Sequence, residues 1–430
     1  MNTFPRFSLI LLGLLSLPAV AREQPAQATS NTDLSCQPPS VMPIADASQE
    51  AFDRYSWQMF VALSWPAEAG ARGQPDCSAA LGAPGPTVWQ TYKNVDEIFL
   101  PGAKPPGPWN SALQAKRLRL INIAALKNNT VVHSDNQAVG GWLIDQNGNP
   151  TYYELAANEA SYNYIVANNF YNADIVSKAS NIKFPNATSE IKSSWRILTA
   201  KDDVSRYLQM PATVTQFNDQ GVPNGTTQVN LGLVGLHIIT KASGYPQWIW
   251  STFEQVDNVP PKSLVEGKWV NQPAPGVKYS YFNASAPADT LNQSPCNWTL
   301  QDGHQVCQPK PGTSFTTPNP LDRFTPLSPA TTALNSQFQA APQVQPTVFK
   351  YYQLVTTQWP TDPSNPSNPL GSPAPALAAN VTMESYIQPN SSCTDCHSKA
   401  TPINSRFKAD FSYLFKFAKA PAGTSIKDEE

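Results

Sequence analysis

Charged residues are scarce in this sequence. Asp, Glu, Lys and Arg make up 14% of the 430 residues, and the formal net charge is −2, whereas typical soluble domains are about 25% charged. So small a net charge gives no electrostatic reason to expect a nucleic acid or an anionic membrane as a partner. Paired carboxylates, activated nucleophiles and phosphate-binding loops are also missing as motifs, so the sequence predicts none of these chemistries.

Long apolar runs are lacking as well, and the one candidate lies at the N-terminus. Phe7–Leu17 is apolar, follows Arg6 and ends before Pro18, which is shorter than the roughly 20 residues that a transmembrane helix needs. Ala19-Val20-Ala21 supplies a small-x-small cleavage pattern. We therefore predict a secretory signal peptide in residues 1–21, cleavage after Ala21, and no membrane span in the mature chain.

Proline and aromatic residues, by contrast, are plentiful. Proline occupies 42 of 430 positions, about double the usual share of roughly 5%. The 11 Trp, 15 Tyr and 18 Phe residues are enough to build a core, which argues against a disordered chain. A chain of this length can bury one large core or two moderate ones, so we expect an ordered protein with long loops.

Hydrophobic periodicity predicts an α+β fold. The run Val229–Thr240 is apolar on both faces, as in a central strand, and 247–254 returns beside it. We predict an antiparallel-sheet-rich main domain with long Pro-rich loops (22–359), a Pro-rich spacer (360–376) and a C-terminal helical segment packed on the main domain (377–430). Further strands are expected at 142–145, 151–155, 189–198 and 347–359, and helices at 46–63 with Asp46 as cap, 158–179, 202–208 and 406–419.

Two of the six cysteines lie next to a histidine near the C-terminus. The run Cys393-Thr394-Asp395-Cys396-His397 places two thiols three residues apart and an imidazole directly after them. Two thiols one helical turn apart can each bond a vinyl group of one porphyrin, and the adjacent imidazole then lies under the iron. With only 4 histidines in the chain, this arrangement rarely arises by accident.

Three other uses of the cysteine pair fit the sequence less well. A thioredoxin-like pair follows a strand in a βαβ pattern, but here Pro389-Asn390-Ser391-Ser392 precedes it. A structural zinc site needs four ligands, and no second ligand pair lies nearby. A plain disulfide would leave His397 without a role. The covalent haem interpretation uses all three side chains.

The five residues resemble the haem-attachment segment of c-type cytochromes. The resemblance implies one covalent haem c, with Cys393 and Cys396 as thioether anchors and His397 as proximal iron ligand. It also implies a bacterial periplasm, where such proteins mature. Small cytochromes c carry the motif near the N-terminus and a methionine ligand downstream, whereas no methionine follows His397 here. The layout is more similar to bacterial periplasmic mono-haem proteins that end in one haem-binding segment.

Any sixth iron ligand must therefore come from elsewhere in the chain. His237 lies in the predicted central strand, and Gly235 on the same face would let a flat macrocycle approach the backbone. Met383 lies ten residues before Cys393 and is a second candidate. His133 and His304 are weaker candidates, because they fall in loop or hairpin context. An open, five-coordinate iron is the remaining alternative, and Glu254, Trp248 and Trp250 could then serve as distal groups.

The four other cysteines are expected to form disulfides in an oxidising compartment. Cys296 and Cys307 bracket Asp302-Gly303, a turn signal between two strand-like arms, so we predict that they close this hairpin. Cys36 and Cys77 then pair by elimination.

These observations leave three functions open. The first is single-electron transfer to or from a redox partner protein by a periplasmic mono-haem cytochrome. The second is a haem-dependent, peroxidase-like oxidoreductase with an open iron and a small-molecule substrate, because the chain is larger than one carrier haem needs. The third is a ligand-binding protein whose haem acts as a sensor. Axial ligand identity separates the first two.

Overall fold

A computed structural model describes most of the chain after the predicted signal peptide. The described residues are 1, 34–39, 48–113, 117–118, 125–127, 130–132, 140–219, 223–242, 245, 247–301, 304–361 and 371–423. The chain divides into two units, Met1–Asn31 and Thr32–Glu430. The signal peptide prediction lies outside the described residues, as does most of the spacer. The elements named below all belong to the second unit.

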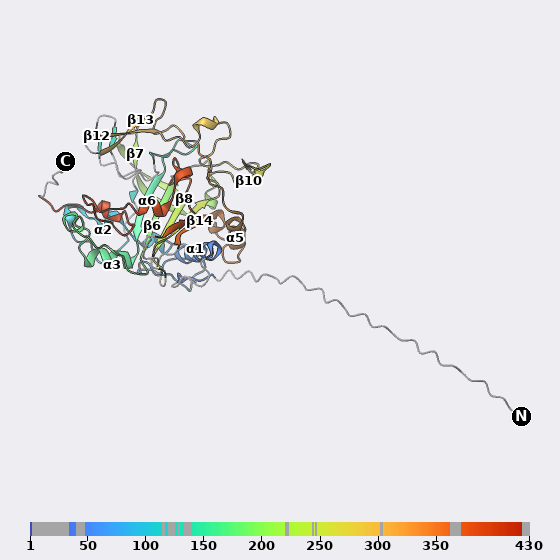
Figure 1. Ribbon diagram of the computed structural model, residues 1–430, viewed down its shortest axis with the longest axis horizontal. Helices are drawn as coiled ribbons and strands as arrows, with labels where there is room; N and C mark the ends of the chain where they lie inside the picture. The colour runs from blue at the N-terminus through green and yellow to red at the C-terminus, as the bar shows by residue number, and fades with distance from the viewer. Residues whose placement is uncertain are drawn as a thin grey trace. The chain divides into compact units, whose positions relative to one another are not determined.

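A large antiparallel sheet lies at the centre of this unit (Figure 1). Its longest strand, β8 (Pro223–Thr240), pairs with β6 (Ser189–Ile197), β7 (Gln209–Phe217) and β9 (Ile249–Gln255). The prediction of an α+β class with an antiparallel, sheet-rich core is confirmed. Along the sheet the order is β1 (Lys93–Asn94), β5 (Tyr152–Ala157), β6, β8, β9, β14 (Tyr352–Thr361) and β15 (Ser372–Ala374), with β2 (Arg117–Leu118) parallel to β7.

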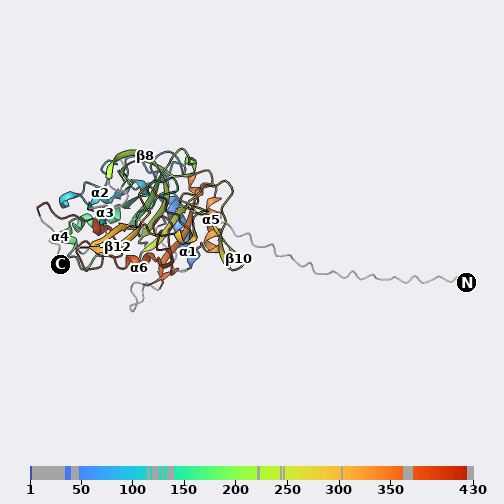
Figure 2. The same ribbon diagram turned by 90° about the horizontal axis from the view of Figure 1, so that it is seen from above.

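Helices α1 (Gln49–Leu63) and α5 (Pro329–Gln339) cover one face of the sheet over β9 and β14, side by side (Figure 2). Phe60 of α1 stacks on Phe253 of β9 with ring centroids 4.3 Å apart. Removing such a buried ring costs about 3–5 kcal/mol of folding free energy. The cap of α1 is Ser48, which accepts the Ala51 N–H at 3.2 Å, and the predicted cap Asp46 lies outside the described residues.

The C-terminal segment covers the opposite face of the sheet. It contains η7 (Gln388–Asn390), α6 (Cys393–His397) and η8 (Leu414–Phe417), and its side chains share the main hydrophobic core. The predicted helix over 406–419 is wrong: only η8 is helical there. Asp410 and Phe411 have positive φ angles of 48° and 66°, which no continuous helix tolerates. The segment is therefore a chain of turns with short helical pieces.

Other element boundaries shift for local reasons. The predicted helix 158–179 is divided into α3 (Glu159–Ala167) and α4 (Ala173–Val176), because Asn169 adopts a positive φ of 56°. Strand 142–145 is reduced to a bridge between Ile144 and Pro150. The remaining short elements are η2 (Trp89–Thr91), α2 (Val95–Ile98), η3 (Pro101–Ala103), η4 (Val204–Arg206), η5 (Ala288–Thr290) and η6 (Val348–Tyr351).

Two smaller sheets flank the large one. β12 (Cys296–Gln301), β13 (His304–Pro309), β4 (Thr130–Val132) and β3 (Ala125–Lys127) form one, and β10 (Lys262–Val265) and β11 (Lys268–Asn271) form the other. Among the described residues, no helix has the length and apolar character needed to cross a membrane.

The disulfide prediction is confirmed for Cys36 and Cys77, which are bonded with 5.5 Å between their Cα atoms. Cys296 is disulfide-bonded too, and the predicted hairpin exists as β12 and β13. The side chain of Cys307 lies outside the described residues, so its pairing with Cys296 stays a prediction.

Non-reducing peptide mapping should recover Cys296 linked to Cys307. The bond would close a loop of about ten residues and stabilise the fold by roughly 2–3 kcal/mol in the chain-entropy model. The linked Cys36–Cys77 peptide serves as the positive control in the same digest. Alkylation of both hairpin thiols in the folded protein would contradict the pairing.

Candidate functional site

A single helical turn, α6, carries the cysteine–histidine motif. The turn begins after Ser392, whose hydroxyl accepts the Asp395 N–H at 3.3 Å. The Thr394 N–H donates to the side-chain oxygen of Gln358 on β14 at 2.8 Å. Since first-turn N–H groups of a helix have no intrahelical acceptor, Gln358 fixes the start of α6 to the sheet.

Both thiols of the motif are free, unlike those of Cys36 and Cys77. Cys393 is buried and Cys396 is exposed. Burial raises the pKa of Cys393 well above its ordinary value, and partial shielding from water raises that of Cys396, which stays exposed at one side. Thiol–disulfide exchange needs a thiolate, and reactive cysteines accordingly have lowered pKa values. These surroundings therefore disfavour thioredoxin-like chemistry.

The ring of His397 is held in one tautomer. Its Nδ1 lies 2.7 Å from the carbonyl oxygen of Phe411. A carbonyl oxygen can only accept, so Nδ1 carries the proton and Nε2 keeps its lone pair. Burial lowers the pKa of His397 to about 4, which favours the neutral ring. A neutral imidazole whose other nitrogen donates to a carbonyl is the usual arrangement of a metal-binding histidine.

The carbonyl of Phe411 is aimed by a strained turn that is anchored to the sheet. The Asp410 carboxylate accepts hydrogen bonds from Lys241 Nζ at 2.8 Å and from the Phe184 N–H at 2.7 Å. Lys241 directly follows β8 and is 2% exposed. This turn was not predicted from the sequence, because a backbone carbonyl acceptor leaves no residue signature.

Replacing Asp410 with alanine should destabilise the protein by about 3–5 kcal/mol, because it leaves the buried Lys241 ammonium without its carboxylate. It should also release the turn that aims Phe411 at His397. Urea unfolding measures the first effect. Asp174→Ala, at an exposed position on α4, is the control and should stay within about 0.5 kcal/mol of wild type. A similarly small change for Asp410→Ala would contradict the anchor.

Two aromatic rings flank His397. The Trp250 ring lies 5.4 Å from it and the Tyr413 ring 5.0 Å, centroid to centroid. The Tyr413 hydroxyl also donates to the Cys396 carbonyl at 2.9 Å, closing the end of α6. The structure thus places Trp250 beside the predicted proximal ligand, whereas Trp248 and Glu254 do not line the cavity that adjoins the motif.

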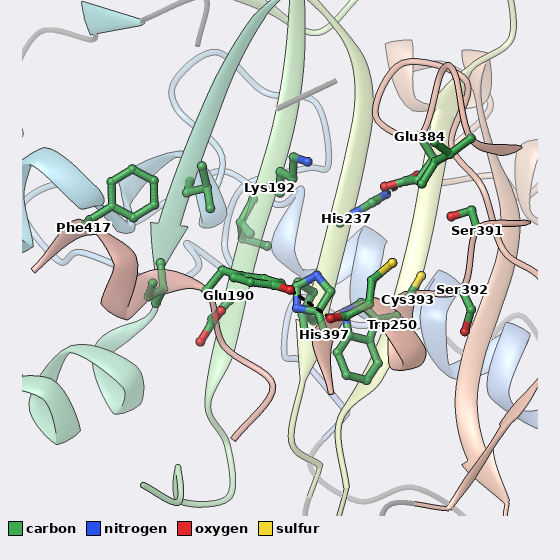
Figure 3. A pocket seen from close by; sticks show the side chains of 17 residues that line it. Glu190, Lys192, His237, Trp250, Glu384, Ser391, Ser392, Cys393, His397 and Phe417 are labelled. Atoms are coloured by element: carbon green, nitrogen blue, oxygen red, sulfur yellow. Dashed lines mark hydrogen bonds and ion pairs between the residues drawn. The ribbon is translucent and has the colours of Figure 1, made fainter. Parts of the chain in front are cut away.

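This cavity of about 340 Å³ lies between the motif and the sheet (Figure 3). Its volume falls within the range of ligand pockets. Both motif thiols and the His397 ring line it, as does His237, so the structure brings the first-ranked sixth-ligand candidate to the motif. The lining residues are Leu155, Glu190, Ile191, Lys192, His237, Ile239, Trp250, Glu384, Ile387, Ser391, Ser392, Cys393, Cys396, His397, Tyr413, Leu414 and Phe417.

These residues fit a covalently attached haem. Cys393 and Cys396 supply two unbonded thiols one turn apart, and His397 supplies a neutral imidazole whose lone pair is on Nε2. The cavity adjoins all three groups, and apolar side chains such as Ile191, Ile239 and Phe417 line part of it.

His237 faces the cavity from β8. In the sheet register it lies between Lys192 of β6 and Thr252 of β9. The side chain is buried, and its Nε2 has no hydrogen-bond partner among the described residues. A carboxylate oxygen of Glu384 lies 3.5 Å from Nε2. An unsatisfied buried ring nitrogen is costly, so Nε2 is best served by the Glu384 carboxylate, which leaves the lone pair of Nδ1 for a metal.

The predicted role of Gly235 is wrong. A Cβ on Gly235 would lie 2.4 Å from Thr382 Oγ1 and 2.5 Å from Ser194 Oγ. The space above this glycine is therefore occupied by the chain itself. The missing side chain of Gly235 makes room for the turn that contains Thr382, and this turn brings Glu384 close to His237. A macrocycle therefore cannot approach the backbone at Gly235.

Met383 lies apart from the motif. It is fully buried in a second hydrophobic cluster with Leu143, Tyr153 and Val381 and is not among the cavity-lining residues. Its surroundings are those of a core methionine that fills space. His133 and the side chain of His304 lie outside the described residues.

Three ionisable residues of the cavity, Glu190, Lys192 and Glu384, were not predicted as site residues. Glu190 and Lys192 lie two residues apart on β6, so their side chains face the same side of the sheet. Burial raises the pKa of Glu190 to about 8. Although burial opposes its charged form, His237, Lys192 and the Asn380 N–H hold the pKa of Glu384 below its ordinary value. The two-residue spacing of Glu190 and Lys192 within a predicted strand was visible in the sequence. The position of Glu384 depends on a tertiary contact and was not.

The described part of the chain gathers no group of three or more His, Cys, Asp or Glu side chains that could hold a bare metal ion. A haem iron differs, because the porphyrin supplies four of its ligands and the protein only the axial ones. Comparisons of the chain with protein-family models, with curated proteins and with solved structures find no match.

Proposed function

We propose that this protein is an exported mono-haem c-type cytochrome that transfers single electrons to or from a redox partner protein. Cys393 and Cys396 would hold the haem through thioether bonds, and His397 would be the proximal ligand. The observation that carries the proposal is the meeting of two free thiols and a tautomer-locked imidazole at one cavity.

Residues around the motif would hold it in place for haem binding. Gln358 fixes α6, the Phe411 carbonyl orients His397, and Trp250 and Tyr413 hold the ring from its sides. A bound haem supplies a one-electron redox centre. A second histidine at the iron would exclude small molecules, and His237 is the candidate on the cavity wall. The exposed Cys396 marks the edge that a redox partner can reach.

The periplasm is the compartment that we propose. The predicted signal peptide in residues 1–21 supports export, and the Cys36–Cys77 disulfide supports an oxidising environment. The resemblance to c-type cytochromes implies the same compartment, because such proteins acquire their covalent haem in the bacterial periplasm.

An absorption spectrum in both redox states, with and without carbon monoxide, tests the proposal. Protein made in a host with haem-maturation machinery should give a low-spin haem c spectrum that carbon monoxide leaves unchanged. A protein that stays colourless under these conditions would overturn the proposal.

A second candidate is a haem-dependent oxidoreductase with an open iron. The observation in its favour is the row of ionisable side chains in the cavity, formed by Lys192, His237, Glu384 and Glu190. Such groups could move protons for a small-molecule substrate such as a peroxide. Carbon monoxide binding by the wild-type protein, together with rapid peroxide reduction, would place this function ahead of electron transfer.

A further inference from the structure

Glu384 is a carboxylate held against the His237 ring by an elaborate support. Its side chain is only 12% exposed and lies 3.5 Å from His237 Nε2 (Figure 3). The same carboxylate accepts the Asn380 N–H at 2.7 Å. Burying a charged group costs several kcal/mol unless partners compensate it, and here the Asn380 N–H and the His237 ring are such partners.

The turn that carries Glu384 is seated on the sheet by polar contacts. Asn380 donates to Thr252 Oγ1 at 3.1 Å and to the Phe253 carbonyl at 2.9 Å. The Val381 N–H donates to the Glu254 carboxylate at 2.7 Å, and Glu254 is itself paired with Arg323. All of these groups are buried, and buried, mutually satisfied polar contacts of this kind make a turn rigid.

Glycine at position 235 also allows the turn to pack against the sheet. A methyl group there would overlap Thr382 Oγ1 at 2.4 Å and would meet the Asn380 side chain at 3.0 Å. The turn contacts β8 at Gly235, which is two residues from His237 and on the same face of the strand. The chain therefore sets the position of Glu384 relative to His237 through a close backbone approach.

We propose that Glu384 is a positioning residue that orients His237 as an axial ligand and lowers the midpoint potential of the iron. This inference rests on the proposed function. A carboxylate that accepts a hydrogen bond from one imidazole nitrogen, here Nε2, keeps the lone pair on the other, Nδ1, and makes the ring a stronger donor. A fixed negative charge near the iron also favours the oxidised state, which carries one more positive charge.

The test is the midpoint potential of the covalent holoprotein at constant pH. Glu384→Gln keeps the size and an acceptor oxygen but removes the charge. We expect the ratio of reduced to oxidised protein at a given applied potential to rise by about tenfold or more, which corresponds to ~59 mV for one electron. Glu384→Asp keeps the charge and should return most of the wild-type potential. Glu159→Gln, which removes an exposed charge on α3, should change nothing.

Gly235→Ala is an independent variant, because it leaves every charged side chain in place. Its Cβ should push the turn and Glu384 away from His237, so the potential should rise in the same direction as in Glu384→Gln. A wild-type potential in both Glu384→Gln and Gly235→Ala would overturn the inference while the cytochrome proposal stands. If Glu384→Gln does not accumulate, Glu384→Asp and Gly235→Ala decide. A wild-type protein without haem would instead overturn the proposed function.

Discussion

Replacing His237 with alanine should convert a low-spin, closed haem iron into a high-spin iron that binds carbon monoxide. The reason is geometric: His237 is buried and lines the same cavity as the motif. Loss of an axial imidazole leaves an open coordination position. We expect the conversion to be nearly complete, and absorption spectra with and without carbon monoxide measure it.

Met383→Leu is the matched control for this substitution. Met383 is fully buried in a separate apolar cluster, and a volume-conserving swap there should cost less than about 1.5 kcal/mol. Its spectrum should match that of the wild type. If the wild type is already high-spin and binds carbon monoxide, the closed site is wrong and the oxidoreductase gains support. If His237→Ala leaves a low-spin spectrum unchanged, Met383 becomes the ligand to test.

Replacing both Cys393 and Cys396 with alanine should abolish covalent haem attachment. Cys393 and Cys396 are the unbonded cysteines that line the cavity in the part of the chain that the structure describes, so they are the thiols expected to form thioethers. Acid–acetone extraction should leave the wild-type protein coloured and remove all colour from the double variant. Either single variant can keep one thioether at most, so its retention of colour should be intermediate.

The second cysteine pair offers a control. Replacing Cys36 and Cys77 with alanine removes a disulfide whose cysteines are 41 residues apart, and the chain-entropy model gives a loss of about 4 kcal/mol of stability. Haem retention should be unchanged, because this pair does not line the cavity. Equal loss of colour in both double variants would indicate that the effect is general unfolding and would contradict the assigned roles.

The sequence predicted the centre of the fold well, because its signals are local. The run 229–240 is apolar on both faces, and such a run has few alternatives to a central strand. The motif at 393–397 and the position of His237 on that strand were visible for the same reason. The structure then places His237 and the motif at one cavity.

The parts that the sequence could not predict depend on contacts between distant segments. Aromatic spacing in 406–419 is compatible with a helix, but the Lys241 and Phe184 contacts of Asp410 favour a turn with positive φ angles. Gly235 has open space above it only if the turn at 380–384 lies elsewhere. The approach of Glu384 to His237 results from that packing and leaves no pattern in the chain.

The most direct test of the central claim is the intact mass of the wild-type protein under denaturing conditions after synthesis with haem-maturation machinery. The account predicts a mature chain, starting at Arg22, that carries the mass of one haem, with neither Cys393 nor Cys396 open to alkylation. A chain without added mass, in which both of these thiols react with the alkylating reagent, would contradict it.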